Sequence, residues 1–429
     1  MPRYGIVPVC LAVLALAACD PSPSPSGSSP LTPTASPTAT DGPGPSGFEV
    51  DPAAASLGDP ASVVLIKSGS SWLYLYDVAS KNAERIDVSE AGAPGYNLTI
   101  DGDVSWDGAQ VAFDSAAEDI IPGDSNAFVD VFLRQVSSGT VFRVSETGTG
   151  EGNEGSSRPR ISADGTHVVF MSYASNLVGG VSRVPQAYLY DVPTGTLSLV
   201  AAIASGEVPY TTTPAISAGG RYVAYGSSTQ GEYGDDNFYG DVFVLDTVTG
   251  AVEQVSLSTD GTPGDFLSST PTISLDGRFV AFQSEASNLV GDDTNTVYDI
   301  FVRDRASGTT TLVSRGTSGL PANGDSQTAL MVGNGSGVVF GSQASDLVPG
   351  DTNEAYDVFY ADLATGEITR LSVAPNGEQG NADSYPDAVY GARYLVFFTY
   401  ASNLGGDGDD GPMRQYVYDL QTGELIRFL

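Results

Sequence analysis

A sequence pattern of about 57 residues recurs along most of this chain, and it limits the possible folds more than any other feature. An aromatic residue at the centre of one apolar segment marks each copy. These residues are Phe113, Phe170, Tyr225, Phe282, Phe340 and Phe397, at successive separations of 57, 55, 57, 58 and 57 residues. Units of this length that consist of short apolar segments and turn residues are typical of a propeller, in which each unit folds into one four-stranded blade.

The copy at residues 271–314 shows the strands most clearly. It predicts strands at 271–274, 278–283, 299–304 and 309–314, with an Asp-Gly turn after the first strand and an Ala-Ser-Gly turn after the third. The first residue of the first strand is Pro271, where a missing N–H is best tolerated. The related copies are residues 104–145, 159–201, 214–256, 327–372 and 386–429.

Residues 61–89 form a seventh and shorter copy. Its third and fourth strands are expected at 72–77 and 84–88, but its second strand reaches Ile66 only six residues before Trp72. The sequence therefore predicts an all-β, seven-bladed β-propeller whose first blade is degenerate, with Phe48–Val50 as a candidate for its irregular inner strand. A six-bladed propeller is the alternative.

The N-terminus has the features of an export signal. Arg3 precedes an apolar segment, Ile6–Ala18, which is well short of the ~20 residues that a membrane-spanning helix needs. The segment ends in Leu16-Ala17-Ala18-Cys19, which resembles the lipobox of bacterial lipoproteins. The resemblance implies a diacylglyceryl group on Cys19 and cleavage before it, so we expect an extracytoplasmic protein that is lipid-anchored to the bacterial cell membrane.

Three segments follow from these observations: a signal sequence at 1–19, a tether at 20–47 and the propeller at 48–429. Residues 20–47 consist mainly of Pro, Ser, Thr and Gly, a composition that cannot bury enough apolar surface to fold. We therefore expect a disordered, extended tether.

The repeated phrase Ile-Ser-x-Asp-Gly-Arg-x-Val-Ala-Phe, followed by Asp-Val-Phe-Val-x-Asp, Thr-Gly and Val-Ser, identifies a family likeness. It resembles the TolB-like, WD-type propeller repeats of bacterial envelope proteins, over residues 61–429. The resemblance implies the propeller fold; the expected function, a binding or scaffold module, rests on the loops described below. The extra N-terminal domain of TolB is not expected here, so no role in the Tol system is carried over.

The charge of the chain excludes several classes of partner. All but two of the 52 acidic residues and all but one of the 18 basic residues follow residue 47, which gives that part a net charge of −33. Such a surface repels phosphate backbones and anionic lipid headgroups, so we expect no nucleic acid and no membrane contact apart from the anchor. Divalent cations and basic surfaces fit better, and we expect a monomer.

The two faces of the predicted propeller differ in loop length. One face has only Asp-Gly and Thr-Gly turns, whereas the other has long loops such as Glu285–Tyr298 and Leu257–Thr270. Long loops on a rigid scaffold commonly carry binding sites. We therefore expect an envelope protein, a glycan or a small ligand to bind the acidic long-loop face, with Asp235, Asp292 and Asp351 at its tips.

The long loops share a Gly-Asp-Thr-Asn-like pattern that ends in an Asp at the start of the third strand. Oxygen ligands at this spacing are suited to Ca²⁺. The alternative is that the Asx side chains bond to nearby backbone and the last Asp fastens the loop to its strand. The candidate ligands are Asp124, Asn126 and Asp130; Asp293, Asn295 and Asp299; and Asp351, Asn353 and Asp357.

No group in the sequence is singled out as catalytic. The only histidine, His167, aligns with Tyr222 and Phe279 at the start of a second strand, where a packing or surface role is expected. With one His and no cysteine after Cys19, triad chemistry of the Ser-His-Asp or Cys-His type has little support. A carboxylate- or calcium-dependent extracytoplasmic hydrolase or lyase is the alternative function, because paired carboxylates suffice for glycoside chemistry.

Overall fold

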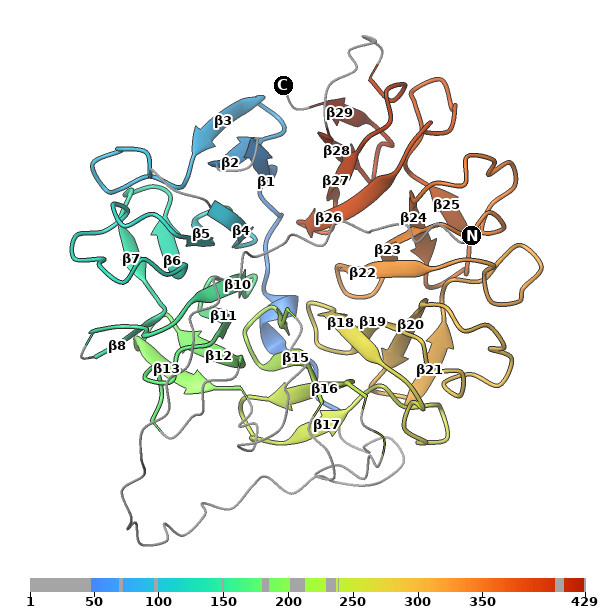
Figure 1. Ribbon diagram of the computed structural model, residues 1–429, viewed down its shortest axis with the longest axis horizontal. Helices are drawn as coiled ribbons and strands as arrows, with labels where there is room; N and C mark the ends of the chain where they lie inside the picture. Colours follow the sequence, from blue (N-terminus) through green and yellow to red (C-terminus); the bar gives the residue numbers. More distant parts are fainter. Residues whose placement is uncertain are drawn as a thin grey trace, which may run out of the picture. The chain divides into compact units, whose positions relative to one another are not determined.

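The structure is a computed structural model that describes residues 48–68, 72–95, 99–148, 150–179, 185–200, 213–228, 237, 239–405 and 413–427. Seven antiparallel sheets follow one another along the chain and form a ring around a central axis (Figure 1). The region along this axis, which the innermost strands line, is here called the central channel. The predicted seven-bladed propeller is therefore confirmed, and the six-bladed alternative is excluded. Cys19 and the tether at 20–47 lie outside the described residues.

Blade I has three strands, and blades II to VII have four strands each. Blade I contains β1 (Val63–Ser68), β2 (Trp72–Asp77) and β3 (Asn82–Arg85). Blade II contains β4 (Thr99–Val104), β5 (Gln110–Ser115), β6 (Asp130–Gln135) and β7 (Val141–Arg143). Blade III contains β10 (Ser156–Ile161), β11 (His167–Ser172), β12 (Gln186–Asp191) and β13 (Thr196–Leu199), and blade IV contains β14 (Ala215–Ile216), β15 (Tyr222–Ser227), β16 (Asp241–Asp246) and β17 (Val252–Gln254).

Blade V contains β18 (Ser268–Ile273), β19 (Phe279–Ser284), β20 (Asp299–Asp304) and β21 (Thr309–Leu312). Blade VI contains β22 (Ser326–Val332), β23 (Gly337–Ser342), β24 (Asp357–Asp362) and β25 (Ile368–Arg370). Blade VII contains β26 (Ser384–Tyr390), β27 (Tyr394–Thr399), β28 (Arg414–Asp419) and β29 (Leu425–Arg427). A small hairpin, β8 (Glu146–Thr147) with β9 (Gly150–Glu151), lies between blades II and III. In blade V the four predicted strands agree with β18 to β21 to within a few residues at each end.

The aromatic residues that mark the repeat form the core of each blade. Phe282 on β19 lies opposite Phe301 on β20, with ring centroids 5.9 Å apart, and both side chains are fully buried. The same stacked pair occurs in blades II, III, IV, VI and VII. Because second and third strands are covered on both sides by neighbouring sheets, they are apolar on both faces.

The Asp-Gly turns also join one blade to the next. Gly277, with φ of +76°, lies against the ring of Tyr222 from the preceding blade, and a Cβ at this position would overlap that ring. Gly335 lies against Phe279 in the same way. Glycine is therefore required here both by the backbone conformation and by the close approach of the neighbouring blade.

The chain does not close the ring by sharing a sheet between its ends. Within the described part, blade I contains only N-terminal strands and blade VII only C-terminal strands. The two blades instead share one apolar core, in which Val64 and Leu65 pack with Tyr394 and Val396. The backbone N–H of Lys67 also donates to Oε1 of Gln415 at 2.9 Å.

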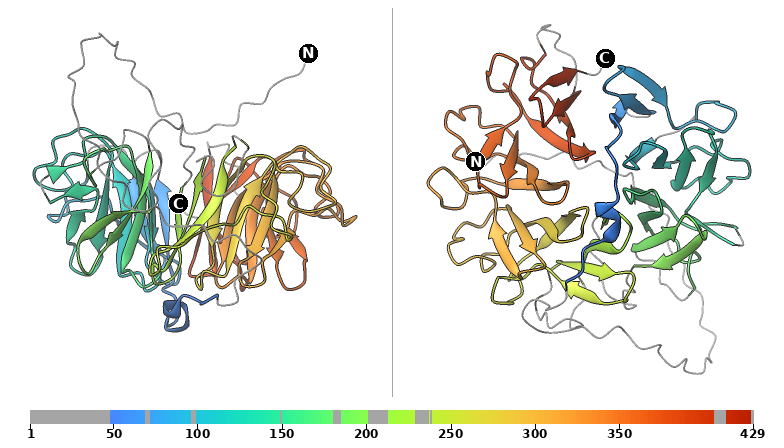
Figure 2. Two further views of the ribbon diagram at one scale, coloured as in Figure 1. Left: turned by 90° about the horizontal axis from the view of Figure 1, so that it is seen from below. Right: turned by 180° about the vertical axis from the view of Figure 1, so that it is seen from behind.

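The expected inner strand at Phe48–Val50 is wrong, because this segment contains no strand. Residues 48–60 instead cross one face of the ring, with the short 3₁₀ helix η1 (Pro52–Ala55) beyond the ends of the strands (Figure 2). We call this segment the N-terminal strap. β1 consequently occupies the place of a second strand, and none of the residues that the structure describes forms an inner strand in blade I.

Asp51 fastens the N-terminal strap to blade IV. Its side chain is almost fully buried and accepts bonds from the Ser217 hydroxyl at 2.6 Å and the Gly219 N–H at 2.8 Å. The ring of Phe48 stacks on Tyr222 at 5.9 Å, and the Arg305 guanidinium lies over both rings. At its other end, the strap accepts a bond from Trp106 Nε1 of blade II to the carbonyl of Gly58.

Candidate functional site

The face that carries the long loops is here called the long-loop face; the loops between second and third strands and those between blades open on it. The opposite face, with the Asp-Gly turns and the turns between third and fourth strands, is called the tight-turn face. The candidate residues of the sequence analysis belong to the long loops. Asp235 lies outside the described residues.

The Asp at the start of the third strand is a structural clamp. In four blades its Oδ1 accepts a short bond, 2.5 or 2.6 Å long, from a Ser hydroxyl just after the fourth strand. The same Ser oxygen accepts the N–H of the residue that follows the Asp. The pairs are Asp130 with Ser145, Asp241 with Ser256, Asp299 with Ser314, and Asp357 with Ser372.

The Asn residues of the pattern tie each long loop to the following inter-blade loop. In blade V, Asn295 accepts the N–H of Val297 in an Asx turn and donates its amide to Asp299 Oδ2 at 2.8 Å and to the carbonyl of Ala322 at 3.2 Å. Asn126 and Asn353 make the equivalent three bonds. Because the Asn oxygen is used by the turn and its amide faces the carboxylate, the geometry favours the turn interpretation.

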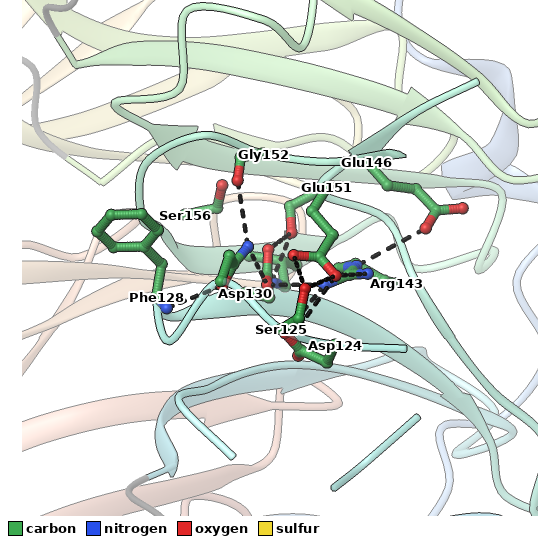
Figure 3. Close-up of polar contacts among 12 residues, drawn as sticks. Asp124, Ser125, Phe128, Asp130, Arg143, Glu146, Glu151, Gly152 and Ser156 are labelled. Atoms are coloured by element: carbon green, nitrogen blue, oxygen red, sulfur yellow. Dashed lines mark hydrogen bonds and ion pairs between the residues drawn. The ribbon is translucent and has the colours of Figure 1, made fainter. Parts of the chain in front are cut away.

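In blade II a guanidinium lies among the candidate ligands (Figure 3). Arg143 Nη1 is 3.0 Å from Asp130 and 3.3 Å from Asp124, and its Nη2 is 3.4 Å from Glu151. The ring of Phe128 points away from this cluster. An arginine therefore supplies the positive charge that Ca²⁺ was predicted to supply.

Blade VI has the same arrangement. Arg370 Nη1 lies 3.3 Å from Asp357 and 3.5 Å from Asp351. The side chain of Asp351 is only 3% exposed, and its carboxylate also accepts a bond from Gln379 at 2.7 Å. Asp351 was expected at an exposed loop tip, and this placement is wrong because the carboxylate folds back onto Arg370.

Blade V differs from blades II and VI because Leu312 occupies the position of Arg143 and Arg370. Asp299 is fully buried there, and this burial raises its pKa to about 6. Burial also raises the pKa of Asp293. The third acid of this loop, Asp292, has an exposed side chain that pairs with Arg315 at 2.7 Å.

Within the described ranges, no group of three or more His, Cys, Asp or Glu side chains is placed to hold a metal ion. Calcium binding by the nine predicted ligands stays a prediction, and chelation tests it. His167 lies on the tight-turn face, where Nε2 is 3.7 Å from Asp191 and Nδ1 is 2.7 Å from the Thr166 hydroxyl.

The central channel holds a charged cluster that the sequence analysis did not identify. Lys67 Nζ lies 3.6 Å from Asp101 and 3.5 Å from Asp387, and Arg160 Nη1 lies 3.0 Å from Asp101. Burial raises the pKa of Asp387 and of Asp103. Lys67 reaches the channel because, among the described residues, no inner strand of blade I covers β1. The shortened first copy of the repeat was the sequence feature that could have indicated this exposure.

A cavity of about 170 Å³ lies at the centre of the ring. Most of its lining residues are apolar, because the ends of the inner strands place one aliphatic or Met residue there from each four-stranded blade, although polar atoms make up the larger part of its exposed wall. Those residues are Val104, Ile161, Ile216, Ile273, Met331 and Val389, and polar groups come from Asp103, Ser105 and Tyr390.

The long-loop face also carries aromatic side chains that the sequence analysis missed. Every large aromatic side chain exposed among the described residues lies at a loop–strand junction on this face. They are Trp72, Phe128, Tyr173, Tyr239, Phe266 and Tyr400, with exposed fractions between 38 and 53%. The sequence feature that could have identified them is an aromatic residue next to a strand end, at a position where most other copies have a smaller or polar residue.

No helix in the described part of the chain is long and apolar enough to cross a membrane. Neither the comparison with protein-family models nor that with curated protein sequences finds a match.

Solved structures share the propeller fold at low sequence identity. A prolyl endopeptidase matches with a TM-score of 0.55 and 13% identity, over 88% of this chain and 51% of that one. The β-propeller domain of the Trilobed protease from Pyrococcus furiosus, whose topology is described as open velcro, matches with a TM-score of 0.52 and 8% identity, over 86% of this chain and 96% of that one. TolB from Acinetobacter baumannii has a TM-score of 0.43 and 16% identity, and the match covers 73% of this chain and 63% of TolB. These likenesses establish the fold alone.

Proposed function

We propose that this protein is an extracytoplasmic lipoprotein, anchored through Cys19, whose propeller binds an envelope partner on the long-loop face. The observation that carries the proposal is the distribution of exposed aromatic residues. All six lie on the long-loop face, whereas the tight-turn face consists of short turns and the N-terminal strap. Exposed aromatic residues gathered on one face mark interaction sites more often than they serve stability.

Exposed carboxylates accompany the aromatic residues. Glu118 in blade II, Asp292 in blade V and Glu354 in blade VI have exposed positions in three separate long loops. Glu118 and Glu354 are available to a partner, and Asp292 is exposed although it pairs with Arg315, in contrast to the buried acids of the Asp–Ser clamps.

The test compares two variants of the full chain with the same change in net charge. Glu118→Lys, Asp292→Lys and Glu354→Lys together reverse charges on the long-loop face. Glu84→Lys, Glu367→Lys and Glu424→Lys reverse three exposed charges at or beside the turns of the opposite face. Partners captured from envelope extract are quantified by mass spectrometry, with melting temperature as the check on folding.

We expect the long-loop variant to lose its partner and the tight-turn variant to keep it. Equal loss from both variants, or loss from the tight-turn variant alone, would contradict the proposal. The control variant leaves Arg305 unchanged, although this residue also lies on the tight-turn face, because its side chain is buried and contacts the N-terminal strap.

A carboxylate-dependent hydrolase or lyase is the second candidate, and the channel cluster favours it. Asp387 lies beside Lys67, keeps 21% of its side chain exposed, and has a pKa that burial raises. A carboxyl group of that kind is suited to general acid catalysis. Turnover of a polysaccharide panel that disappears in Asp387→Asn, with folding unchanged, would favour this candidate over binding alone.

A further inference from the structure

The tight-turn face repeats one arrangement of three side chains. In blade V the Arg278 guanidinium lies 4.7 Å from the centre of the Phe279 ring and pairs with Asp304 at 2.7 Å. The aromatic residue and the Asp are directly opposite each other on neighbouring strands. The same triad occurs in blade VII as Arg393, Tyr394 and Asp419, and in blade IV as Arg221, Tyr222 and Asp246.

On the long-loop face most of the exposed rings lack such an arginine. Trp72 has one, since Arg85 lies 5.0 Å from its ring centre and pairs with Asp87. Among the residues that the structure describes, no arginine lies over the other five rings, which are Phe128, Tyr173, Tyr239, Phe266 and Tyr400.

Acidic residues adjoin two of these rings in the chain or in the fold. Asp265 directly precedes Phe266, whose ring packs against Tyr239 with centroids 4.0 Å apart. The backbone carbonyl of Asp383 accepts the N–H of Tyr400 at 2.8 Å. In the described part of the chain, these two rings thus adjoin an acidic residue and have no arginine over them.

We infer that the long-loop face binds a basic protein partner whose arginine side chains stack on these exposed aromatic rings. The inference rests on the proposed function and names the chemistry of its partner. Arginine stacks on aromatic faces and pairs with carboxylates through the same planar group.

Charge favours a basic protein over a glycan. A net charge of −33 attracts a cationic partner, gives a neutral glycan no advantage and repels an anionic one. The rings also belong to blades I, II, III, IV and VII and to the loop before blade V, so they are spread around the ring of blades. Aromatic anchors distributed over a broad surface are typical of protein interfaces.

The test uses two fluorescent peptides of equal charge, nona-arginine and nona-lysine, with the full chain. We expect nona-arginine to bind at least fivefold more tightly, and to keep that preference in 0.3 M salt, where simple charge attraction is largely screened. Tyr239→Leu, Phe266→Leu and Tyr400→Leu together should remove the preference, because leucine keeps apolar area and loses the aromatic face. The matched ring-preserving variant, Tyr239→Phe with Tyr400→Phe, should retain it.

Three results would overturn the inference: equal binding of the two peptides, a preference that survives the leucine variant, or binding of a neutral oligosaccharide through the same rings. The charge-reversal experiment described under the proposed function distinguishes these three results from a failure of the proposed function itself. If the long-loop variant loses its envelope partner while the peptides bind equally, the face is functional and its partner is not recognised through arginine. If the long-loop variant keeps its partner, the proposed function itself fails.

Discussion

Replacing Asp299 by Asn should stabilise the protein at neutral pH, because this carboxylate is buried without a guanidinium. The folded-state pKa is about 6, against an ordinary value of 3.8. Between these values the folded state holds a proton that the unfolded state has released, so the free energy of unfolding falls as pH rises through this window. A shift of this size corresponds to about 3 kcal/mol, which is lost by pH 7.

The variant avoids this loss and gives up part of a hydrogen bond. Asn has the same shape but one acceptor oxygen in place of two. With that oxygen on the Asn295 amide, its own NH₂ group faces Ser314 Oγ, so the charge-assisted bond from the Ser314 hydroxyl is replaced by a neutral bond in the opposite direction. With about 1.5 kcal/mol for that bond, the net gain at pH 7 is about 1 to 2 kcal/mol. Near pH 4.5, where Asp299 is protonated in the folded state, we expect no gain.

The assay is chemical denaturation of wild type and variant at several pH values between 4.5 and 7. Asp130→Asn is the matched control, because Asp130 forms the same clamp with Ser145 but pairs with Arg143 at 3.0 Å. Removing the Asp130 carboxylate should lower the free energy of unfolding at pH 7 by roughly 2 kcal/mol. This cost is smaller than that of breaking an isolated buried ion pair, because Arg143 still pairs with Asp124 and Glu151. An Asp299→Asn advantage that is independent of pH, or destabilisation equal to that of the control, would refute the reasoning.

Three further predictions follow from other parts of the chain. Cys19→Ala should abolish lipidation and membrane retention, which fractionation after a high-salt wash measures; a variant that still matures and stays bound would contradict the anchor. Chelation should leave the melting temperature unchanged, because arginine occupies the cluster in blades II and VI and the Asn295 amide faces Asp299 in blade V, whereas recovery of lost stability on adding Ca²⁺ would establish a metal site. Asp51→Ala should lower the free energy of unfolding by about 2 to 4 kcal/mol and expose the N-terminal strap to proteolysis, because the Ser217 hydroxyl and the Gly219 N–H lose their acceptor. Asp59→Ala, at an exposed position of the same strap, is the control, and equal effects of the two variants would show that Asp51 does not fasten the strap.

The blades could be predicted from the sequence because their contacts are local and repeat. The Asp and Ser of each clamp are about 15 residues apart, so the same pair returns at the same spacing in four blades. The position of the strand ends follows from the turns, where only glycine fits. A chain with this period has few other ways to bury its apolar segments.

The N-terminal strap could not be predicted in this way. Asp51 bonds to Ser217 across 166 residues of sequence, and Phe48 meets Tyr222 and Arg305 in two different blades. These contacts occur once, so no repetition marks them. The short segment Phe48–Val50 looked like a strand because its residues are apolar or extended-favouring, yet blade I leaves its inner position empty and exposes Lys67 to the channel.

The repeat itself separates the residues that build the fold from those left for a partner. Asp130, Asp299 and Asp357 recur because each forms a clamp with a Ser. Many of the carboxylates of the long loops are therefore buried in the protein and not exposed on its surface. The aromatic residues behave differently: Tyr173, Phe266 and Tyr400 lie at positions where other copies have Glu285, Gly324 and Gln343. A side chain that the fold needs appears in copy after copy, whereas an exposed one that most copies lack has no such structural reason. Recognition on the long-loop face is therefore expected to depend on the residues that depart from the repeat.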